Sequence, residues 1–284
     1  MFTDTHCHVF HPKIAAKALA QLEGHYGIRP QGTGVLDDLL ARADRAGIAR
    51  MVVHTAATEP AQVIPANNWA LDLMRQSPRI TAFGTLHPDY ADPAQELDRL
   101  ARAGVVGLKF HPDFQGFFLD DPKFYTLMER IGSRFMLMFH VGDRLPPAQN
   151  PSCPIKLARL RREFPGPVMI AAHLGGYLHW EWAVEHLAGL DVYMDTSSSL
   201  RHIRDNTLRA LIRRHAPERL LFGSDYPLFD PGDEIPLIEQ RLVPLGLRLS
   251  DILAAGAALF PERGQDQAPP LPTLPNANSP GQTC

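Results

Sequence analysis

Short runs of apolar residues alternate along this chain with longer segments in which apolar residues recur at helical spacing. Each run is continuously apolar, which is typical of a strand buried on both faces. We predict strands over residues 1–5, 49–55, 80–86, 105–109, 135–139, 168–172, 191–196 and 219–224.

A helical pattern follows each predicted strand, and glycine ends several of these patterns, as at Gly47, Gly104 and Gly189. A loop and helix region is expected over 11–32, and helices over 37–46, 67–76, 94–103, 121–130, 155–163, 180–187, 207–215, 234–242 and 250–259. Eight strand–helix alternations predict an α/β fold, a closed parallel (β/α)₈ TIM barrel in a single domain. The barrel domain is expected to span 1–262. Residues 263–284 are rich in proline and polar residues, so we predict a flexible tail there.

Composition narrows the class of protein. The chain has 284 residues, of which 45% are hydrophobic, enough for one large core. Its net charge of −3, without a basic block, gives no support for nucleic-acid binding. Neither a signal peptide nor a membrane-spanning run is indicated. Three cysteines without a close pair fit a reducing compartment, so we expect a cytoplasmic protein.

The predicted strands end in polar residues capable of chemistry. His6 and His8 lie two residues apart in the first strand, so their side chains face the same side, whereas Cys7 points into the barrel wall. Later apolar runs end at Lys109, His140, His173 and Asp225. In a TIM barrel the carboxyl ends of the strands meet at one mouth, which is where such barrels hold their active sites.

These residue types indicate a metal centre. Imidazole nitrogens and a carboxylate oxygen are suitable ligands for zinc and similar ions, and His6, His8, His140 and Asp225 would supply them. An ion there would activate water, and Asp225 could act as the proton shuttle. His173 could hold a second ion or polarise the group under attack. We therefore expect one or two divalent ions, Zn²⁺ or Mn²⁺.

Lys109 has two interpretations. Carboxylated by carbon dioxide, it would bridge two ions. Beside a single ion, its ammonium would hold a substrate carboxylate. Other candidates for substrate binding on the strand-end loops are His111, His87, His54 and Arg144. His111 could equally be a turn residue, and His54 and His87 also suit a supporting role.

Five motifs occur in an order that resembles the amidohydrolase superfamily, in particular its amidohydrolase-related branch. They are Asp4-Thr5-His6-Cys7-His8, Gly107-Leu108-Lys109-Phe110-His111-Pro112, Phe139-His140-Val141-Gly142, Ala172-His173-Leu174-Gly175-Gly176 and Gly223-Ser224-Asp225-Tyr226-Pro227. The resemblance covers residues 1 to about 260. It implies His6, His8 and Asp225 as ligands of the first ion, His140 as a ligand of the first or second, and His173 as a second-ion ligand or electrophilic aid. Some members carry a carboxylated lysine at the position of Lys109, and others use one ion.

The resemblance implies two chemistries. We expect hydrolysis of a small organic amide, lactone or ester by metal-activated water. The alternative is non-oxidative decarboxylation of a small carboxylic acid, similar to aminocarboxymuconate semialdehyde decarboxylase. A binding module without catalysis, or a metal-free lactonase or isomerase, would contradict both. The expected partner is a small-molecule substrate, with no nucleic acid and no membrane. Barrels of this kind often form homodimers, but the sequence predicts no interface.

Overall fold

The structure is a computed structural model that describes residues 2–260. The tail predicted for 263–284 lies outside these residues. Strands and helices alternate along the described part of the chain. The strands are β1 (Thr3–His8), β2 (Arg50–His54), β3 (Ile80–Ala82), β4 (Gly107–Phe110), β5 (Met136–Phe139), β6 (Met169–Ala171), β7 (Tyr193–Asp195) and β8 (Leu220–Leu221).

The strands form a closed ring. Parallel pairing joins β1, β2 and β3 into one sheet and β4 through β8 into another. A parallel bridge between Gly84 and Leu108 connects β3 to β4, and one between Cys7 and Tyr226 connects β8 back to β1. The predicted (β/α)₈ barrel is confirmed.

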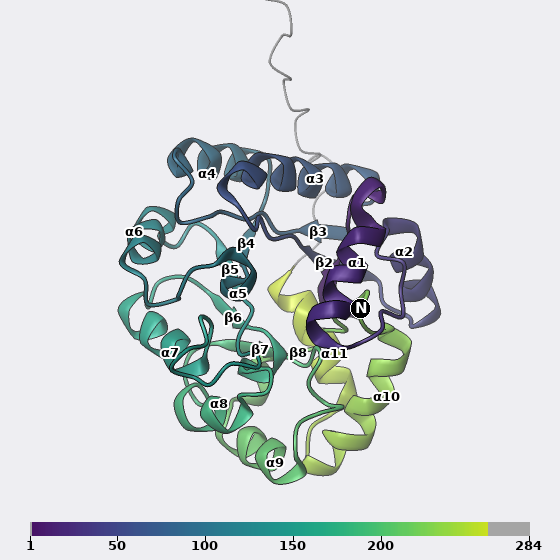
Figure 1. Cartoon of the computed structure of the whole chain (residues 1–284). Helices are drawn as coiled ribbons and strands as arrows, with labels where there is room; N and C mark the ends of the chain where they lie inside the picture. The colour runs from purple at the N-terminus through teal and green to yellow at the C-terminus, as the bar shows by residue number, and fades with distance from the viewer. Residues whose placement is uncertain (1, 261–284) are drawn as a thin grey trace, which may run out of the picture.

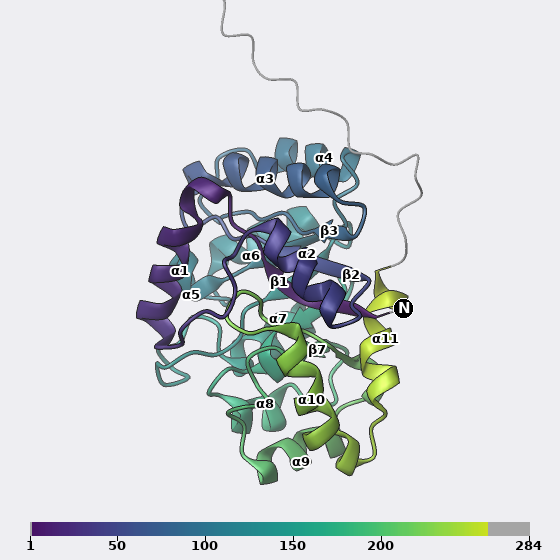
Figure 2. The same cartoon turned by 90° about the vertical axis from the view of Figure 1, so that its right-hand side faces the viewer.

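Helices surround the ring, as Figure 1 shows. They are α2 (Leu36–Arg45), α3 (Val63–Gln76), α4 (Pro93–Arg102), α6 (Pro122–Ile131), α7 (Pro154–Glu163), α8 (Trp180–His186), α9 (Asp205–Arg214), α10 (Pro231–Arg241) and α11 (Leu249–Leu259). Two further helices, α1 (Pro12–Tyr26) and the short α5 (Pro112–Gln115), lie at the mouth of the barrel. The turned view in Figure 2 places both at the end opposite α11.

Several strand boundaries differ from the predicted ones, and the differences concern residues of the candidate site. β1 extends through His8 rather than ending at residue 5, so both histidines belong to the strand. β6, β7 and β8 are shorter than predicted because the chain leaves the ladder early. Three of the residues that follow these strands, His173, Ser198 and Asp225, have positive φ angles of 61°, 49° and 64°. Such strained backbone often accompanies a functional site.

The core has two layers. Strand residues that face outward pack against the helices, and Cys7 lies in this outer layer, fully buried, as predicted. Residues that face inward fill the lower part of the barrel: Val52, Phe83, Met138, Ile170, Ala172, Leu221 and, from the end of α11, Phe260. Above this plug, the inward-facing positions at the mouth carry polar side chains.

No single helix between residues 2 and 260 is long and apolar enough to span a membrane. Two adjoining helical segments, Pro231–Leu245 and Leu249–Leu259, together have the length and composition of a span, but the chain bends by 111° between them.

Gly107 leaves room for the ring of Phe83 inside the barrel, so we expect a side chain at this position to lower stability. A Cβ atom at Gly107 would lie 2.2 Å from the Phe83 ring, which is enclosed by the barrel wall. We expect Gly107→Ala to lower the free energy of unfolding by about 1–3 kcal/mol, because overpacking strains a closed core. Gly24 has open space around it, so Gly24→Ala should leave stability unchanged or slightly raised. Urea unfolding measures both variants, and equal stabilities would contradict the packing argument.

His215 predicts a pH effect on stability. Burial, aided by Arg219, lowers the pKa of His215 to about 4 from 6.5. The unfolded chain therefore binds a proton between pH 6.5 and 4 that the native state does not, so the native state loses stability as the pH falls through this window. Between pH 7 and 5 the His215 contribution amounts to about 2 kcal/mol. His215→Gln should remove that part of the decrease in urea unfolding, and an unchanged pH profile would show that His215 is not responsible.

Candidate metal centre and active site

Three polar side chains converge at the mouth of the barrel. His6 Nε2 and His8 Nε2 lie 3.2 Å apart. Asp225 Oδ1 is 3.6 Å from His6 Nε2 and 3.4 Å from His8 Nε2. We call these residues the metal trio, because they are three of the four first-ion ligands that the sequence predicted.

Hydrogen bonds to neighbouring residues orient both imidazoles of β1. His6 Nδ1 donates to Asp195 Oδ2 at 2.9 Å, and His8 Nδ1 donates to the carbonyl of His54 at 3.1 Å. A histidine that donates from one ring nitrogen presents a lone pair on the other. Both Nε2 atoms are therefore free to bind a cation at the point where they meet Asp225.

The backbone fixes Asp225. Its amide donates to the carbonyl of His6 at 2.8 Å, across the junction of β8 with β1. Ser198 Oγ donates to Asp225 Oδ2. The carboxylate therefore has one oxygen held by Ser198 and the other directed at the two histidines.

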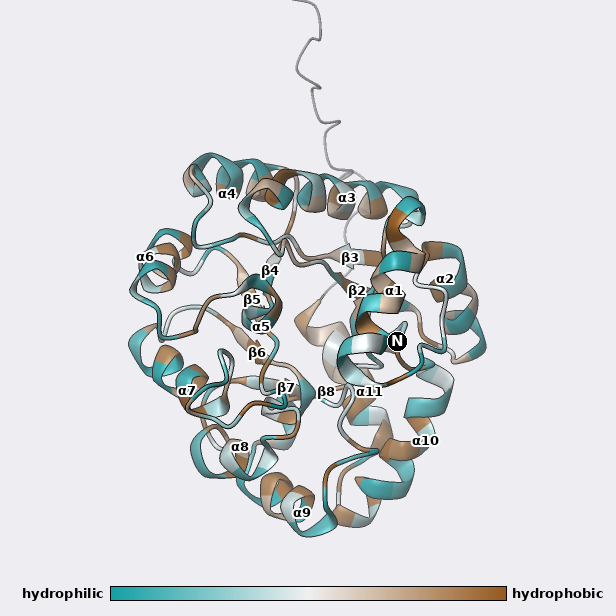
Figure 3. Ribbon diagram, viewed as in Figure 1, coloured by the Kyte–Doolittle hydropathy of each residue, from teal (hydrophilic) through white to brown (hydrophobic). Residues whose placement is uncertain are grey.

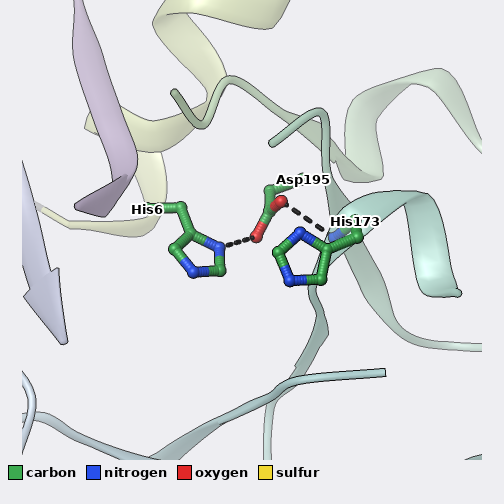
Figure 4. A group of neighbouring side chains, drawn as sticks. All are labelled: His6, His173 and Asp195. Carbon is green, nitrogen blue, oxygen red and sulfur yellow. Dashed lines mark hydrogen bonds and ion pairs between the residues drawn. The ribbon is translucent and has the colours of Figure 1, made fainter. Parts of the chain in front are cut away.

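Asp195, at the end of β7, is a site residue that the sequence analysis missed. Figure 4 shows it between His6 and His173, accepting from the ring of His6 and the backbone amide of His173. The amide and hydroxyl of Ser197 also donate to Asp195. Its position at a strand end was a signal available in the sequence, as it was for Asp225.

Lys109 lies directly beside the metal trio. Its Nζ is 3.4 Å from His6 Nε2, and the residue is 1% exposed. Within residues 2–260, no carboxylate oxygen lies within 4.0 Å of Nζ. The side chain therefore brings a buried amine to the site, whereas its carboxylation stays a prediction.

His140 and His173 face each other rather than the metal trio. His140 Nε2 donates to the carbonyl of Gly142 at 2.8 Å, and its Nδ1 lies 3.0 Å from His173 Nε2. His173 Nδ1 is 2.9 Å from Ser197 Oγ. His173 also stacks on His6, with ring centroids 5.1 Å apart. The structure thus brings His173 to the site and places His140 one step further away, while their roles as ligands stay predictions.

The four predicted substrate-binding residues occupy different positions. His111 stacks on His140 at a centroid distance of 3.8 Å, and its Nε2 lies 3.2 Å from the Tyr26 hydroxyl. His54 stands beside His6, with its Nε2 donating to the carbonyl of Thr5. His87 holds the carbonyl of Gln115 and the amide of Asp89, which favours a supporting role. Arg144 is exposed at the rim.

Comparison with known proteins decides the family. A sequence profile of the amidohydrolase family matches residues 3–256. The chain belongs to the amidohydrolase family. No curated protein matches its sequence.

Several solved structures share the fold of this amidohydrolase. The 5-carboxyvanillate decarboxylase of Sphingomonas paucimobilis is 17% identical, with a TM-score of 0.64 over 91% of this chain and 98% of that one. A dihydroxybenzoic acid decarboxylase from Polaromonas sp. JS666, with bound manganese and the inhibitor 2-nitroresorcinol, is 16% identical, with a TM-score of 0.65 over 92% and 97%. A putative 2-pyrone-4,6-dicarboxylic acid hydrolase from Pseudomonas putida is 19% identical, with a TM-score of 0.60 over 91% and 97%.

Burial sets the charge of the groups in this amidohydrolase site. It lowers the pKa of His6 well below the ordinary value, and nearby Lys109 lowers it further, so the imidazole is neutral. Burial alone would raise the pKa of Asp225, but the surrounding imidazoles, His6 foremost, bring it well below the ordinary value. Burial also lowers the pKa of Lys109 to about 8, against the opposing effect of Asp195 and Asp225. The site therefore combines the neutral imidazole of His6, a carboxylate and an amine.

This donor set fits a divalent ion. Two nitrogen lone pairs that face each other at 3.2 Å repel unless a cation lies between them. Ligand atoms placed about 2.0–2.2 Å from one tetrahedral ion are roughly 3.3–3.6 Å apart, close to the separations within the metal trio. The ligand atoms of His6, His8 and Asp225 lie within 4.8 Å of one another. Two further groups meet that criterion, His6 with His173 and Asp195, and His111 with Asp113 and His140. In the first of these, His6 Nδ1 already donates to Asp195 Oδ2.

Asp195 predicts a measurable effect on metal affinity. Asp195→Asn removes the acceptor that keeps the proton of His6 on Nδ1, so Nε2 becomes a poorer ligand. We expect about 10- to 100-fold weaker binding of Mn²⁺ or Zn²⁺, measured by competition with a chelating dye. Asp191→Asn is the matched control, because Asp191 pairs with Arg161 and Arg219 away from the metal trio. Equal affinities of the two variants would contradict the role assigned to Asp195.

Proposed function

We propose that this amidohydrolase is a metal-dependent, non-oxidative decarboxylase of a small carboxylic acid. The sequence placed hydrolysis first and decarboxylation second. The position of Lys109 is the observation that reverses this order.

Lys109 supports an acidic substrate because a buried ammonium needs a counter-charge. Without a bound ion, a pKa of about 8 leaves the amine mainly protonated at pH 7. Its hydrogen-bond contact is the His6 imidazole, at 3.4 Å, whereas Asp195 and Asp225 act on it from beyond 4.0 Å. Removing an ammonium from water is costly unless an anion pairs with it, and a substrate carboxylate would provide that partner. The names of the three structural relatives all refer to carboxylic acids, two of them as substrates of decarboxylases.

Each residue of the site has a defined part in the proposed reaction. His6, His8 and Asp225 would hold the divalent ion, Zn²⁺ or Mn²⁺, which supplies a Lewis acid to bind and polarise a substrate oxygen. Lys109 would orient the carboxylate beside it. The bond between the carboxylate carbon and the neighbouring carbon breaks, carbon dioxide leaves, and the electron pair stays on that neighbouring carbon. A proton from water must then reach this carbon to replace carbon dioxide, and Asp225 is the group that we propose relays it.

His173 and Asp195 complete the assignment. We propose that His173 polarises the substrate after its Nε2 leaves His140 Nδ1, while Ser197 Oγ continues to hold its Nδ1. Asp195 keeps His6 in the tautomer that binds metal. Hydrolysis remains the second candidate, since the carboxylate of Asp225 could equally act as a general base toward water.

Activity measurements separate these two reactions. The protein, loaded with Mn²⁺ or Zn²⁺, is incubated with a panel of hydroxybenzoates and with a panel of lactones, and carbon dioxide release and acid release are followed. We expect carbon dioxide from a member of the first panel. Lactone or ester hydrolysis without any carbon dioxide would favour hydrolysis and contradict our proposal.

Two variants test the assigned roles. Asp225→Asn should lower kcat by more than about two orders of magnitude, the usual contribution of a proton-transfer group. Lys109→Met should lower kcat/KM by about 10- to 100-fold, mainly through KM, because it removes a charge-assisted contact to the substrate. The control is Lys123→Met, because Lys123 is an exposed lysine on α6 that pairs with Asp89. Activity of Asp225→Asn within tenfold of the unaltered protein would refute the proton-relay role.

A further inference from the structure

Helix α1 is packed unlike the helices of the barrel wall. β1 is followed by two helices, of which α2 packs against the wall, while α1 lies across the mouth (Figures 1 and 2). Ala15 is the one buried residue of α1, whereas α3, of similar length, buries six. Ile14 on α1 is 53% exposed. The contacts that hold α1 down are therefore few.

The C-terminal end of α1 carries its main contacts with the mouth. His25 Nε2 lies 2.8 Å from Asp143 Oδ2, and the Tyr26 hydroxyl lies 3.2 Å from His111 Nε2. The Tyr26 ring also meets Tyr177 edge-on at 5.7 Å. Gly27, with φ of 68°, then ends the helix. These are side-chain contacts to loops, which can break without disturbing the strand ladder.

The site beneath these contacts is closed except at His8, whose side chain is 22% exposed. His6 and Lys109 are 1% exposed, His173 is 3% exposed and Asp225 is 5% exposed. Tyr26 lies above this group, with its ring 6.4 Å from that of His140, which in turn contacts His173. A substrate larger than water can reach these side chains only if part of the mouth moves aside.

We infer that α1 is a movable cover over the active site and that Tyr26 is the residue that closes it. Substrate enters when Tyr26 leaves His111 and Tyr177 and when His25 leaves Asp143. Local opening of this kind follows from low burial and few contacts, because the free energy of opening scales with the interactions lost. The inference concerns access to the site and does not depend on which reaction takes place there.

Chemical labelling of buried histidines tests this inference without substrate, metal or turnover. Diethyl pyrocarbonate modifies neutral imidazoles that it can reach. His173 lies beneath the cover, and His215 lies away from the mouth, after α9; both are 3% exposed. The ratio of their labelling rates is measured by mass spectrometry on the full chain. It reports opening at the mouth, because global unfolding exposes both histidines and leaves the ratio unchanged.

Tyr26→Ala should raise the His173 to His215 ratio by at least about threefold, the change expected when a hydrogen bond and a ring contact are lost. Tyr26→Phe keeps the ring and should give a smaller rise. The control is Tyr125→Ala on the outer helix α6, where Tyr125 packs against Phe164, and it should leave the ratio unchanged.

Hydrogen exchange provides the second readout. In Tyr26→Ala the amides of α1 should exchange faster while those of α3 do not change. An unchanged labelling ratio in Tyr26→Ala, or the same rise in Tyr125→Ala, would overturn the assignment of Tyr26. Exchange of α1 as slow as that of α3 in the unaltered protein would overturn the movable cover. None of these outcomes bears on decarboxylation, so the two proposals can fail separately.

Discussion

The junction between β8 and β1 is the constraint on which the site depends. Thr5 N donates to the carbonyl of Phe222, Asp225 N donates to that of His6, and His8 N donates to that of Tyr226. These hydrogen bonds close the ring and, in the same step, set the Asp225 carboxylate beside the two imidazoles. Gly223 is part of this arrangement, because a Cβ there would lie 2.8 Å from the Cβ of His6. The metal trio is therefore as rigid as the barrel.

In the buried mouth, few positively charged groups among residues 2–260 are present to balance the charges of two carboxylates. Asp195 and Asp225 are carboxylates in a region where burial disfavours ions, and they are held by hydrogen bonds from serine and histidine. Burial lowers the pKa of the nearby Lys109 to about 8, while both carboxylates raise it. Burial lowers the pKa of His6 and of His111 well below the ordinary value, and Lys109 lowers it further, so these two imidazoles stay neutral. A site of this kind is prepared to take up a cation and an anionic ligand together.

Rigidity and mobility are divided between different parts of the molecule. The wall consists of parallel strands packed on both faces, with the inner plug from Val52 to Phe260 below and helices outside. Helix α1 instead rests on the mouth through His25 and Tyr26, with most of its surface exposed. The residues that we propose as metal ligands belong to the rigid wall, and the helix that we infer to control access rests on the mouth. This division lets a tightly preorganised centre exchange small molecules.

The sequence by itself determined the architecture and most of the centre. Continuous apolar runs alternating with helical patterns specify buried parallel strands, and such strands with their helices can bury both faces by closing into a barrel. Polar residues at the strand ends then had to meet at one mouth, which is why His6, His8, Lys109, His173 and Asp225 could be named in advance. The period-two geometry of a strand likewise placed Cys7 in the outer layer.

Tertiary structure alone decided which of the candidates touch. Asp195 is one of 31 acidic residues in the sequence, and only the pairing of β7 beside β6 and the ring closure bring it to His6. His140 ends a strand like the others, yet its ring turns to Gly142 and His173 because those partners are nearer than the metal trio. The pattern of α1 indicates a helix but not its position. Distances across a closed barrel depend on how the ring is joined and packed, and no local pattern of residues contains that information.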